Sequence, residues 1–379
     1  MARESKKQRA VSMDRLSSLP DELLLHILSF LDATEVFMTS FLCERWRYLW
    51  TKLPILHFDS RYFPRDNLFL NFVQHFLFRR GDSTIVSDLS FVNHRQNHMR
   101  SFYFFVEGIM NYVKPLGIQS LRISADIETQ AISQLFDCQS LQSLKLERII
   151  TSLDALDFTA LKKLNLVCCK FTCYTENSLN PFKGCSNLKS LTLDSCTFIC
   201  GILERLEISA PELTDLSILW MKHNGNLDGG CVIVLSTPKL KTFTYDYSDL
   251  YEFSIMVDLP LMHEVHVDVS TRCGCFDRSE VGSLKSAKQL FNLLKAMGNA
   301  KFFTLTERTI SVLSVLPLQF QLPAPFPELK TLKALIRKRR TSINLLSVKL
   351  IAFLMAGNCE FGGVRMEYQE KEYRDNHSI

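Results

Sequence analysis

The chain has 379 residues, of which 46% are hydrophobic and 22% are charged, so it can bury large apolar cores and should be folded over most of its length. The formal net charge of +4 comes largely from the first ten residues, and the remainder is nearly balanced. Proteins that bind nucleic acids concentrate basic charge on a folded face, so this charge distribution argues against a nucleic-acid partner.

Residues 1–13 form a basic segment that we expect to be a disordered tail. The segment lacks the apolar core of a secretory signal. The longest apolar stretch, at 345–357, is shorter than the roughly 18–20 residues that span a bilayer. We therefore expect no membrane contact and a location in the nucleus, the cytoplasm or both, where the 12 cysteines stay reduced.

Residues 14–53 predict three short helices. Pro20 suits the first position of a helix, and an apolar stripe follows it at Leu23, Leu24, Ile27, Leu28 and Leu31. Asp32 or Thr34 can cap a second helix, and residues 44–50 predict a third. A segment of this length cannot enclose all these apolar side chains, and some of them should therefore contact another folded surface. That surface belongs either to a second protein or to the rest of this chain, on which the segment would then pack as an N-terminal cap.

The sequence LPDELLLHILSFL, followed by TSFLCERWRYLW, resembles the F-box of plant F-box/leucine-rich-repeat proteins without a gap. It departs from the family pattern at Cys43 and Glu44, where the family usually has Ser and Lys, and Glu44 reverses a charge. The resemblance implies docking on a Skp-family adaptor, with some matching residues serving as internal core instead. The residues that match the adaptor-contact positions are Leu19, Pro20, Leu23, Ile27, Leu28, Leu31, Val36, Leu42, Trp46, Leu49 and Trp50.

Beyond Pro54 the pattern L-x-x-L-x-L recurs. Copies that start at Ile118, Leu141, Leu161, Leu188 and Leu213 are separated by 23, 20, 27 and 25 residues, within the range of leucine-rich repeats. Looser copies start at Leu240, Met262, Ala300 and Leu329, and degenerate opening strands at 53–59 and 83–92 precede helices at 68–78 and 101–113. A further copy at 203–208 interrupts the period, and we interpret it as a strand on the other side of one coil or as an irregular repeat.

Two copies agree beyond the leucines, since Cys169 and Cys196, then Phe171 and Phe198, stand at the same offsets. A cysteine repeated at one register is expected to be a buried thiol that packs as a small apolar group.

The predicted fold is therefore α/β: an F-box at 14–53, a leucine-rich-repeat solenoid at 54–337 and a C-terminal cap or tail at 338–379. Parallel strands should line the concave face of the solenoid, and irregular helices should cover its convex face. The family often ends in an FBD domain, whose hallmarks we do not find in this sequence.

The residues that alternate with the leucines should face the concave surface and select a target protein. They run from mixed and basic to acidic, so we expect a target that presents acidic groups to the early repeats and basic groups to the late ones. The alternative is that solvated strand faces are charged without any binding role. The candidate target-binding residues are Arg122, Lys145, Lys163, Asp194, Arg205, Asp215, Asp246, Glu264, His266 and Asp268.

No enzyme signature is present. The chain contains no nucleophile elbow, phosphate-binding loop or dinucleotide-binding glycine pattern. His263 and His266 lie in a strand-like alternation that points them apart, and Cys168-Cys169 and Cys273-x-Cys275 lack zinc-finger spacing. We therefore expect no catalytic residue, no metal and no cofactor.

The resemblance implies a substrate-receptor subunit of an SCF-type cullin-RING ubiquitin ligase, whose adaptor joins the receptor to a cullin and a RING protein. One alternative is a repeat protein that binds a partner as a scaffold or inhibitor outside any ligase. Another is a co-receptor in which a small molecule completes the target site.

Overall fold

The structure is a computed structural model of the whole chain. It describes residue 16 and residues 18–81, 85–95, 100–131, 138–152, 156–172, 178–199, 205–223, 232–247, 252–255, 259–269, 280–316, 326–337, 354 and 364–369. The basic tail at 1–13, the Cys273-x-Cys275 pair and nearly all of the expected cap at 338–379 lie outside the described residues.

The N-terminal segment contains α1 (Asp21–Leu28), α2 (Ala33–Thr39) and the 3-10 helix η1 (Leu49–Lys52). Pro20 is the N-cap of α1, one position before the place predicted for it. The predicted third α-helix at 44–50 is wrong, because i-to-i+3 hydrogen bonds such as Trp46 N to the Cys43 oxygen form turns that lead into η1. A 3-10 helix satisfies the same i, i+3 apolar spacing as an α-helix.

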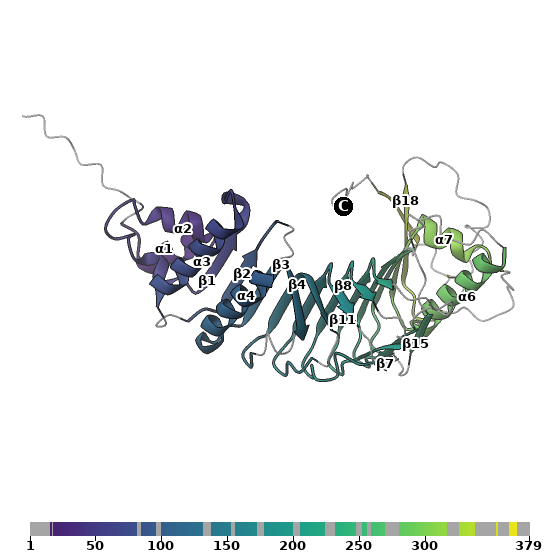
Figure 1. The fold of residues 1–379 in the computed structure, drawn as a ribbon. Helices are drawn as coiled ribbons and strands as arrows, with labels where there is room; N and C mark the ends of the chain where they lie inside the picture. Colours follow the sequence, from purple (N-terminus) through teal and green to yellow (C-terminus); the bar gives the residue numbers. More distant parts are fainter. Residues whose placement is uncertain are drawn as a thin grey trace, which may run out of the picture.

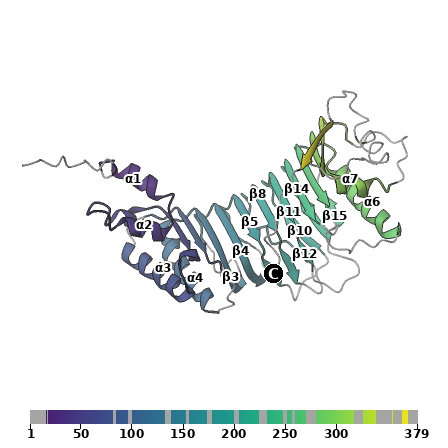
Figure 2. The same ribbon diagram turned by 90° about the horizontal axis from the view of Figure 1, so that it is seen from above.

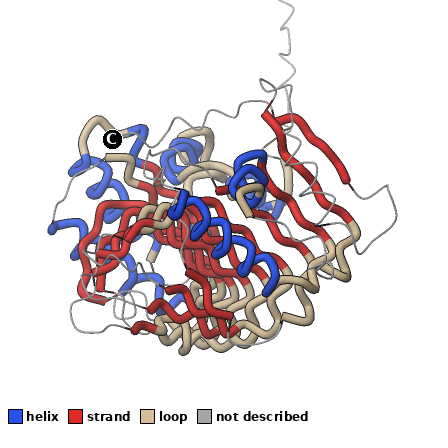
Figure 3. Tube along the Cα trace, turned by 90° about the vertical axis from the view of Figure 1, so that its right-hand side faces the viewer, coloured by secondary structure: helices blue, strands red, loops and turns tan. Residues whose placement is uncertain are grey.

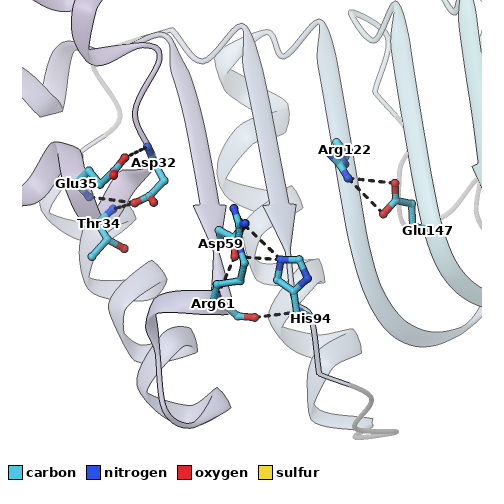
Figure 4. Close-up of polar contacts among 9 residues, drawn as sticks. Asp32, Thr34, Glu35, Asp59, Arg61, His94, Arg122 and Glu147 are labelled. Atoms are coloured by element: carbon cyan, nitrogen blue, oxygen red, sulfur yellow. Dashed lines mark hydrogen bonds and ion pairs between the residues drawn. The ribbon is translucent and has the colours of Figure 1, made fainter. Parts of the chain in front are cut away.

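The start of α2 is fixed by a capping box (Figure 4). One carboxylate oxygen of Asp32 accepts hydrogen bonds from the backbone N–H of Thr34 at 2.7 Å and of Glu35 at 3.0 Å. The Glu35 carboxylate in turn accepts from the backbone N–H of Asp32 at 3.2 Å. This arrangement satisfies backbone donors that a helix start leaves unpaired.

Replacing Asp32 with alanine is therefore expected to lower the free energy of unfolding by about 1 kcal/mol. The comparison variant is Asp32→Asn, which keeps an acceptor at the cap and should cost less. Urea denaturation followed by circular dichroism measures both. Equal losses for the two variants would show that the cap hydrogen bonds do not contribute.

After the N-terminal segment come β1 (Ile55–Asp59), η2 (Ser60–Tyr62), α3 (Asp66–Arg80), β2 (Asp88–Val92), α4 (Arg100–Val113) and η3 (Lys114–Leu116). The predicted opening strands and the two predicted helices are thus confirmed. The Asp59 carboxylate accepts from Arg61 Nε at 2.9 Å and lies 3.3 Å from His94 Nε2, which ties the ends of β1 and β2 together (Figure 4).

The remaining elements are mostly short strands: β3 (Ser120–Ala131), β4 (Ser143–Ser152), β5 (Lys163–Val167), β6 (Lys170–Thr172), β7 (Ser178–Leu179), β8 (Ser190–Asp194), β9 (Thr197–Ile199), β10 (Arg205–Ser209), β11 (Asp215–Leu219), β12 (Lys222–His223), β13 (Val232–Ser236), β14 (Thr242–Tyr247), β15 (Glu252–Ile255), β16 (Glu264–Val269), β17 (Phe302–Thr306), β18 (Thr331–Arg337) and β19 (Val364–Gln369). Two helices, α6 (Glu280–Ala296) and α7 (Glu307–Leu313), lie among the late strands.

The described strands form a 15-stranded parallel sheet and a 4-stranded parallel sheet. The large sheet follows the repeats in the order β1-β2-β3-β4-β5-β8-β11-β14-β16-β17-β18-β19. Figure 1 shows it as a curved stack, with α1 and α2 at one end and α6 and α7 at the other. Figure 2 shows the strands side by side, with α3 and α4 along one edge. No described helix is long and apolar enough to cross a lipid bilayer.

The repeat leucines lie on one side of the large sheet and are buried. Leu121, Leu144, Leu164, Leu191 and Leu216 pair across adjacent strands and are at most 1% exposed. The looser copies keep the register, since Phe243, Val265, Phe303 and Leu332 continue the same row. The predicted apolar periodicity is confirmed, and the alternating residues occupy the opposite face, called here the open sheet face.

A buried cysteine follows each of the strands β5 and β8. Cys169 and Cys196 are fully buried, and their Sγ atoms donate to the carbonyl oxygens of Leu146 and Leu166 in the preceding repeats, at 3.5 and 3.4 Å. Burial raises the pKa of the Cys196 thiol well above its ordinary value. The prediction of buried, packed thiols at this register is confirmed.

The 4-stranded sheet has the order β15-β13-β10-β7 and contains the copy that breaks the repeat spacing. Leu206 and Ile208 of β10 are buried, and β10 pairs with β13 and β7. The interpretation of residues 203–208 as a strand on the other side of a coil is therefore confirmed for the described part, 205–208. Figure 3 looks along the stack and shows its strands as red tubes lying one behind another.

Candidate functional site

The N-terminal segment presents a group of exposed apolar side chains, called here the F-box surface. Phe30, Phe41, Tyr48 and Leu42 are 75%, 72%, 66% and 64% exposed. The group consists of Leu16, Leu23, Ile27, Phe30, Met38, Phe41, Leu42 and Tyr48. These eight are half of the 16 exposed large apolar side chains among the described residues, and such a concentration in one short segment is typical of an interaction site.

Helix α1 has apolar residues on two faces. Leu24 and Leu28, one turn apart, are buried against the rest of the chain. Leu23 and Ile27, also one turn apart, are exposed, and Phe30 continues their stripe after the helix ends. The inner stripe holds the helix in place while the outer one remains available, since i and i+4 positions share a face.

The adaptor-contact residues implied by the family resemblance divide into two groups. Pro20, Leu23, Ile27 and Leu42 are exposed, while Leu19 and Leu31 are half-buried. Five others are interior residues in this structure and are corrected to core positions, because their side chains pack within the chain: Leu28, Val36, Trp46, Leu49 and Trp50.

Trp50 illustrates the correction. It is 5% exposed, and its ring lies 4.6 Å from that of Phe76 in α3 and 5.9 Å from that of Phe37 in α2. Its Nε1 donates to the carbonyl oxygen of Arg47 at 3.0 Å. With its polar atom paired and its ring enclosed, Trp50 joins the F-box to the rest of the chain and offers no surface to an adaptor.

The sequence reasoning missed Phe30, Met38, Phe41 and Tyr48, which are among the most exposed apolar side chains described. A signal for Phe30 was present, since Leu23, Ile27 and Phe30 follow the i, i+4, i+7 spacing of one helix face. The apolar residues of α1 cover too wide an arc for a single buried stripe, which indicates two contact faces.

The N-terminal segment also contains ionic contacts that involve the first residue of α1. Arg45 Nη2 lies 2.8 Å from the Asp21 carboxylate, and Lys52 Nζ lies 3.6 Å from it. The hydrogen bond from Arg45 lowers the pKa of the Asp21 carboxyl. These contacts tie the start of α1 to the segment that follows α2.

On the open sheet face, the early cations are already paired. Arg122 Nη2 lies 3.2 Å from the Glu147 carboxylate (Figure 4), and Lys145 Nζ lies 2.7 Å from it. Burial raises the pKa of Glu147, but the hydrogen bonds from Lys145 and Ser124 and the charge of Arg122 outweigh burial and lower it. Two of the three early cations therefore share one carboxylate, which leaves one unit of positive charge in that trio, while Lys163 is exposed.

The late part of this face carries a row of carboxylates. The strand register places Asp194, Leu219, Asp246 and Asp268 in one row on β8, β11, β14 and β16. Adjacent strands are about 4.8 Å apart, so the last two carboxylates are near neighbours. Asp215 and Glu264 occupy a second row on the same strands, and both residues are exposed.

His266 lies between the two rows. Burial lowers its pKa below the ordinary value, although the charges of Asp268 and Glu264 oppose the effect. The ring is therefore uncharged at neutral pH and does not offset the neighbouring carboxylates. The Asp268 carboxylate accepts a hydrogen bond from Thr306 Oγ1 at 2.7 Å.

Arg205 does not belong to this face. It lies on β10 in the 4-stranded sheet, while the other candidate target-binding residues lie on strands of the large sheet. The placement of Arg205 beside them is wrong, because residues 205–209 form the strand on the opposite side of the coil. The expected gradient from mixed and basic to acidic stays a prediction, since Glu147 offsets only one unit of the early positive charge.

No group of three or more His, Cys, Asp and Glu side chains suited to a metal ion occurs within the described ranges. His263 is exposed beside the start of β16, and its ring contacts Phe302 at 4.9 Å. His266 is half-buried in the strand.

Comparison with known proteins matches residues 16–58 to the F-box domain. An F-box/FBD/LRR-repeat protein of Arabidopsis thaliana is 32% identical over 73% of this chain and 64% of its own length. Two F-box/LRR-repeat proteins of Arabidopsis thaliana are 29% and 25% identical over 68% and 79% of this chain and 68% and 66% of their own lengths. The chain thus spans less than two thirds of the first of these relatives. Residues 16–58 are thus an F-box domain, and the chain is similar over most of its length to plant F-box/leucine-rich-repeat proteins.

Proposed function

We propose that this chain is the substrate-receptor subunit of an SCF-type cullin-RING ubiquitin ligase. The F-box surface binds a Skp-family adaptor, which F-box domains generally bind, and the adaptor joins the chain to a cullin and a RING protein. The repeat region is a leucine-rich-repeat solenoid whose open sheet face holds the target. The observation that carries the proposal is the group of exposed apolar side chains within the matched F-box.

In this role the chain carries out no bond chemistry. It holds a target lysine near the ubiquitin thioester of a conjugating enzyme, which makes an intermolecular reaction effectively intramolecular. Tethering of this kind raises local concentrations to roughly the millimolar range when the tether is short and flexible.

Co-expression of the full chain with a Skp-family adaptor and a cullin tests the proposal. We expect the chain to purify in a stoichiometric complex with the adaptor, and the cullin to join only when the adaptor is present. A chain that elutes alone under the same conditions would contradict the ligase role and favour a repeat protein that binds its partner outside any ligase.

For the target, the open sheet face favours a protein segment that carries Lys or Arg side chains. The late strands carry five carboxylates on this face, with Lys333 of β18 in the row of His266, and complementary potentials guide association and exclude wrong partners. The expected acidic contact to the early repeats is kept, because Arg122 and Lys145 share the single Glu147 carboxylate and retain one unit of positive charge between them. Exposed Lys163 remains available there.

Reversing the charge of Asp246, Glu264 and Asp268 to lysine is expected to abolish capture of the target, since each change turns attraction into repulsion. Affinity purification from the native tissue measures how much target each chain recovers. All chains carry Ile27→Asp in the F-box surface, which prevents turnover of the target. The matched control reverses Glu212 and Glu328, which lie outside the open sheet face. Equal target recovery from all chains would exclude the acidic rows as the contact.

A further inference from the structure

A buried arginine lies where the F-box meets the repeat region. Arg80 is the last residue of α3 and is 4% exposed. Its Nε donates to the carbonyl oxygen of Thr51 at 3.1 Å, and its Nη2 donates to the carbonyl oxygens of Leu53 and Ile85. Thr51 and Leu53 belong to the end of η1 and its cap, so one guanidinium joins the last segment of the F-box to a helix of the repeat region.

Arg80 forms no ion pair with any described residue, and its Nη1 has no hydrogen-bond acceptor among them. Burial lowers its pKa, while the phenol of Tyr112 opposes this effect. A guanidinium stays charged in proteins, so carbonyl dipoles and the phenol of Tyr112 compensate a buried cation without a carboxylate among the described residues. An apolar side chain of similar size would avoid this cost, which makes Arg80 a poor choice for stability alone.

The junction also contains an exposed hydrogen bond between the side chains of Tyr62 and Asp32, and several aromatic contacts. The ring of Phe37 in α2 lies 6.2 Å from that of Phe72, and the ring of Trp50 lies 4.6 Å from that of Phe76. Aromatic pairs are favourable over a broad range of separations and tilts, and apolar contact is non-directional. These rings therefore hold the F-box against α3 without setting its angle.

The hydrogen bonds of Arg80 have the opposite character. Their strength falls steeply when the donor angle departs from linearity, and the guanidinium presents its N–H groups in a rigid planar fork. Because Thr51 and Leu53 of the F-box bond to this one group, which Ile85 also holds from the repeat region, a rotation of the F-box on the aromatic contacts would break two bonds at once.

We infer that Arg80 is a positioning residue that fixes the orientation of the F-box relative to the open sheet face. In the ligase, this orientation determines where a bound target lies relative to the adaptor. The consequence for the ligase rests on the proposed function, whereas the orientation itself is a property of this chain alone.

Electron-electron distance measurements on the full chain test the inference. Nitroxide labels are introduced through p-acetylphenylalanine at the exposed positions Glu44 and Lys170, one in the F-box and one on β6. We expect a narrow distance distribution in the parent chain. In Arg80→Met the distribution should widen about twofold, because the buried directional contacts are lost and only non-directional contacts and the exposed Tyr62–Asp32 hydrogen bond remain.

The matched control is Arg95→Met. Arg95 Nη2 donates to the carbonyl oxygen of Phe63 at 2.7 Å, a contact within the repeat region. This control should keep the narrow distribution. An Arg80→Met chain that melts at a lower temperature but keeps the parent distribution would reduce Arg80 to a stabilising residue and overturn the inference.

If Arg80→Met fails to fold, Arg80→Lys takes its place, since an ammonium keeps the charge but lacks the planar fork. An unchanged distribution in Arg80→Lys would overturn the inference equally. In the reconstituted ligase, the orientation variant should keep its affinity for the adaptor and for the target while ubiquitin transfer slows. Should the parent chain bind no adaptor, the proposed function fails, and the distance measurement still decides the role of Arg80.

Discussion

Replacing Ile27 with aspartate is expected to weaken binding of a Skp-family adaptor about 30-fold or more, since a central apolar contact in an interface contributes about 2 kcal/mol or more. Ile27 is 39% exposed on the outer stripe of α1, so the substitution places a charge in the F-box surface and leaves the inner stripe intact. Titration calorimetry with the purified adaptor measures the change.

The control for Ile27→Asp is Phe78→Asp. Phe78 is an even more exposed apolar residue, at 84%, but it lies on α3 outside the F-box. We expect the control to bind the adaptor like the parent chain. If the two substitutions weaken adaptor binding equally, the weaker binding comes from a general loss of apolar surface, and the F-box surface is not the specific contact.

Replacing Trp50 with alanine is expected to lower the free energy of unfolding by about 3–5 kcal/mol, which is typical of a buried tryptophan. The change removes the ring contacts with Phe76 and Phe37 and leaves a cavity between α2, η1 and α3. Urea denaturation followed by circular dichroism measures the loss.

Tyr48→Ala is the matched control, because Tyr48 is two residues away and 66% exposed. Its free energy of unfolding should change by no more than about 0.5 kcal/mol. A Trp50→Ala chain as stable as the parent would show that Trp50 is not the core residue described above, and would return it to the adaptor-contact group.

The repeat region was the most predictable part of the molecule. Each copy of L-x-x-L-x-L contributes two inward positions, and a slip of one residue would expose both of them, so the pattern determines the register. This holds even in loose copies, where Phe243 and Tyr245 or Phe303 and Leu305 replace leucines and remain buried.

The sequence was less informative where one spacing serves two structures. Trp46, Leu49 and Trp50 follow a spacing that suits an α-helix and also the turns and 3-10 helix that form. Residues 205–208 have the repeat pattern but pair with β13 in the smaller sheet, since a strand on the far side of a coil buries its alternate residues in the same way.

The division of the F-box between core and surface could not be predicted either. Leu23, Leu24, Ile27 and Leu28 are all apolar, and only the packing of α1 shows which pair faces outward. The buried role of Arg80 gave no sequence signal, because its acceptors are backbone carbonyl groups that any residue could supply.

Hydrogen exchange of the full chain with and without a Skp-family adaptor tests the central claim most directly. The account predicts slower exchange across residues 21–48, which contain α1, α2 and the exposed Phe30, Phe41 and Tyr48, with no change on the strands of the open sheet face. Unchanged exchange at 21–48 in the presence of saturating adaptor would contradict the claim that the F-box surface is a docking site.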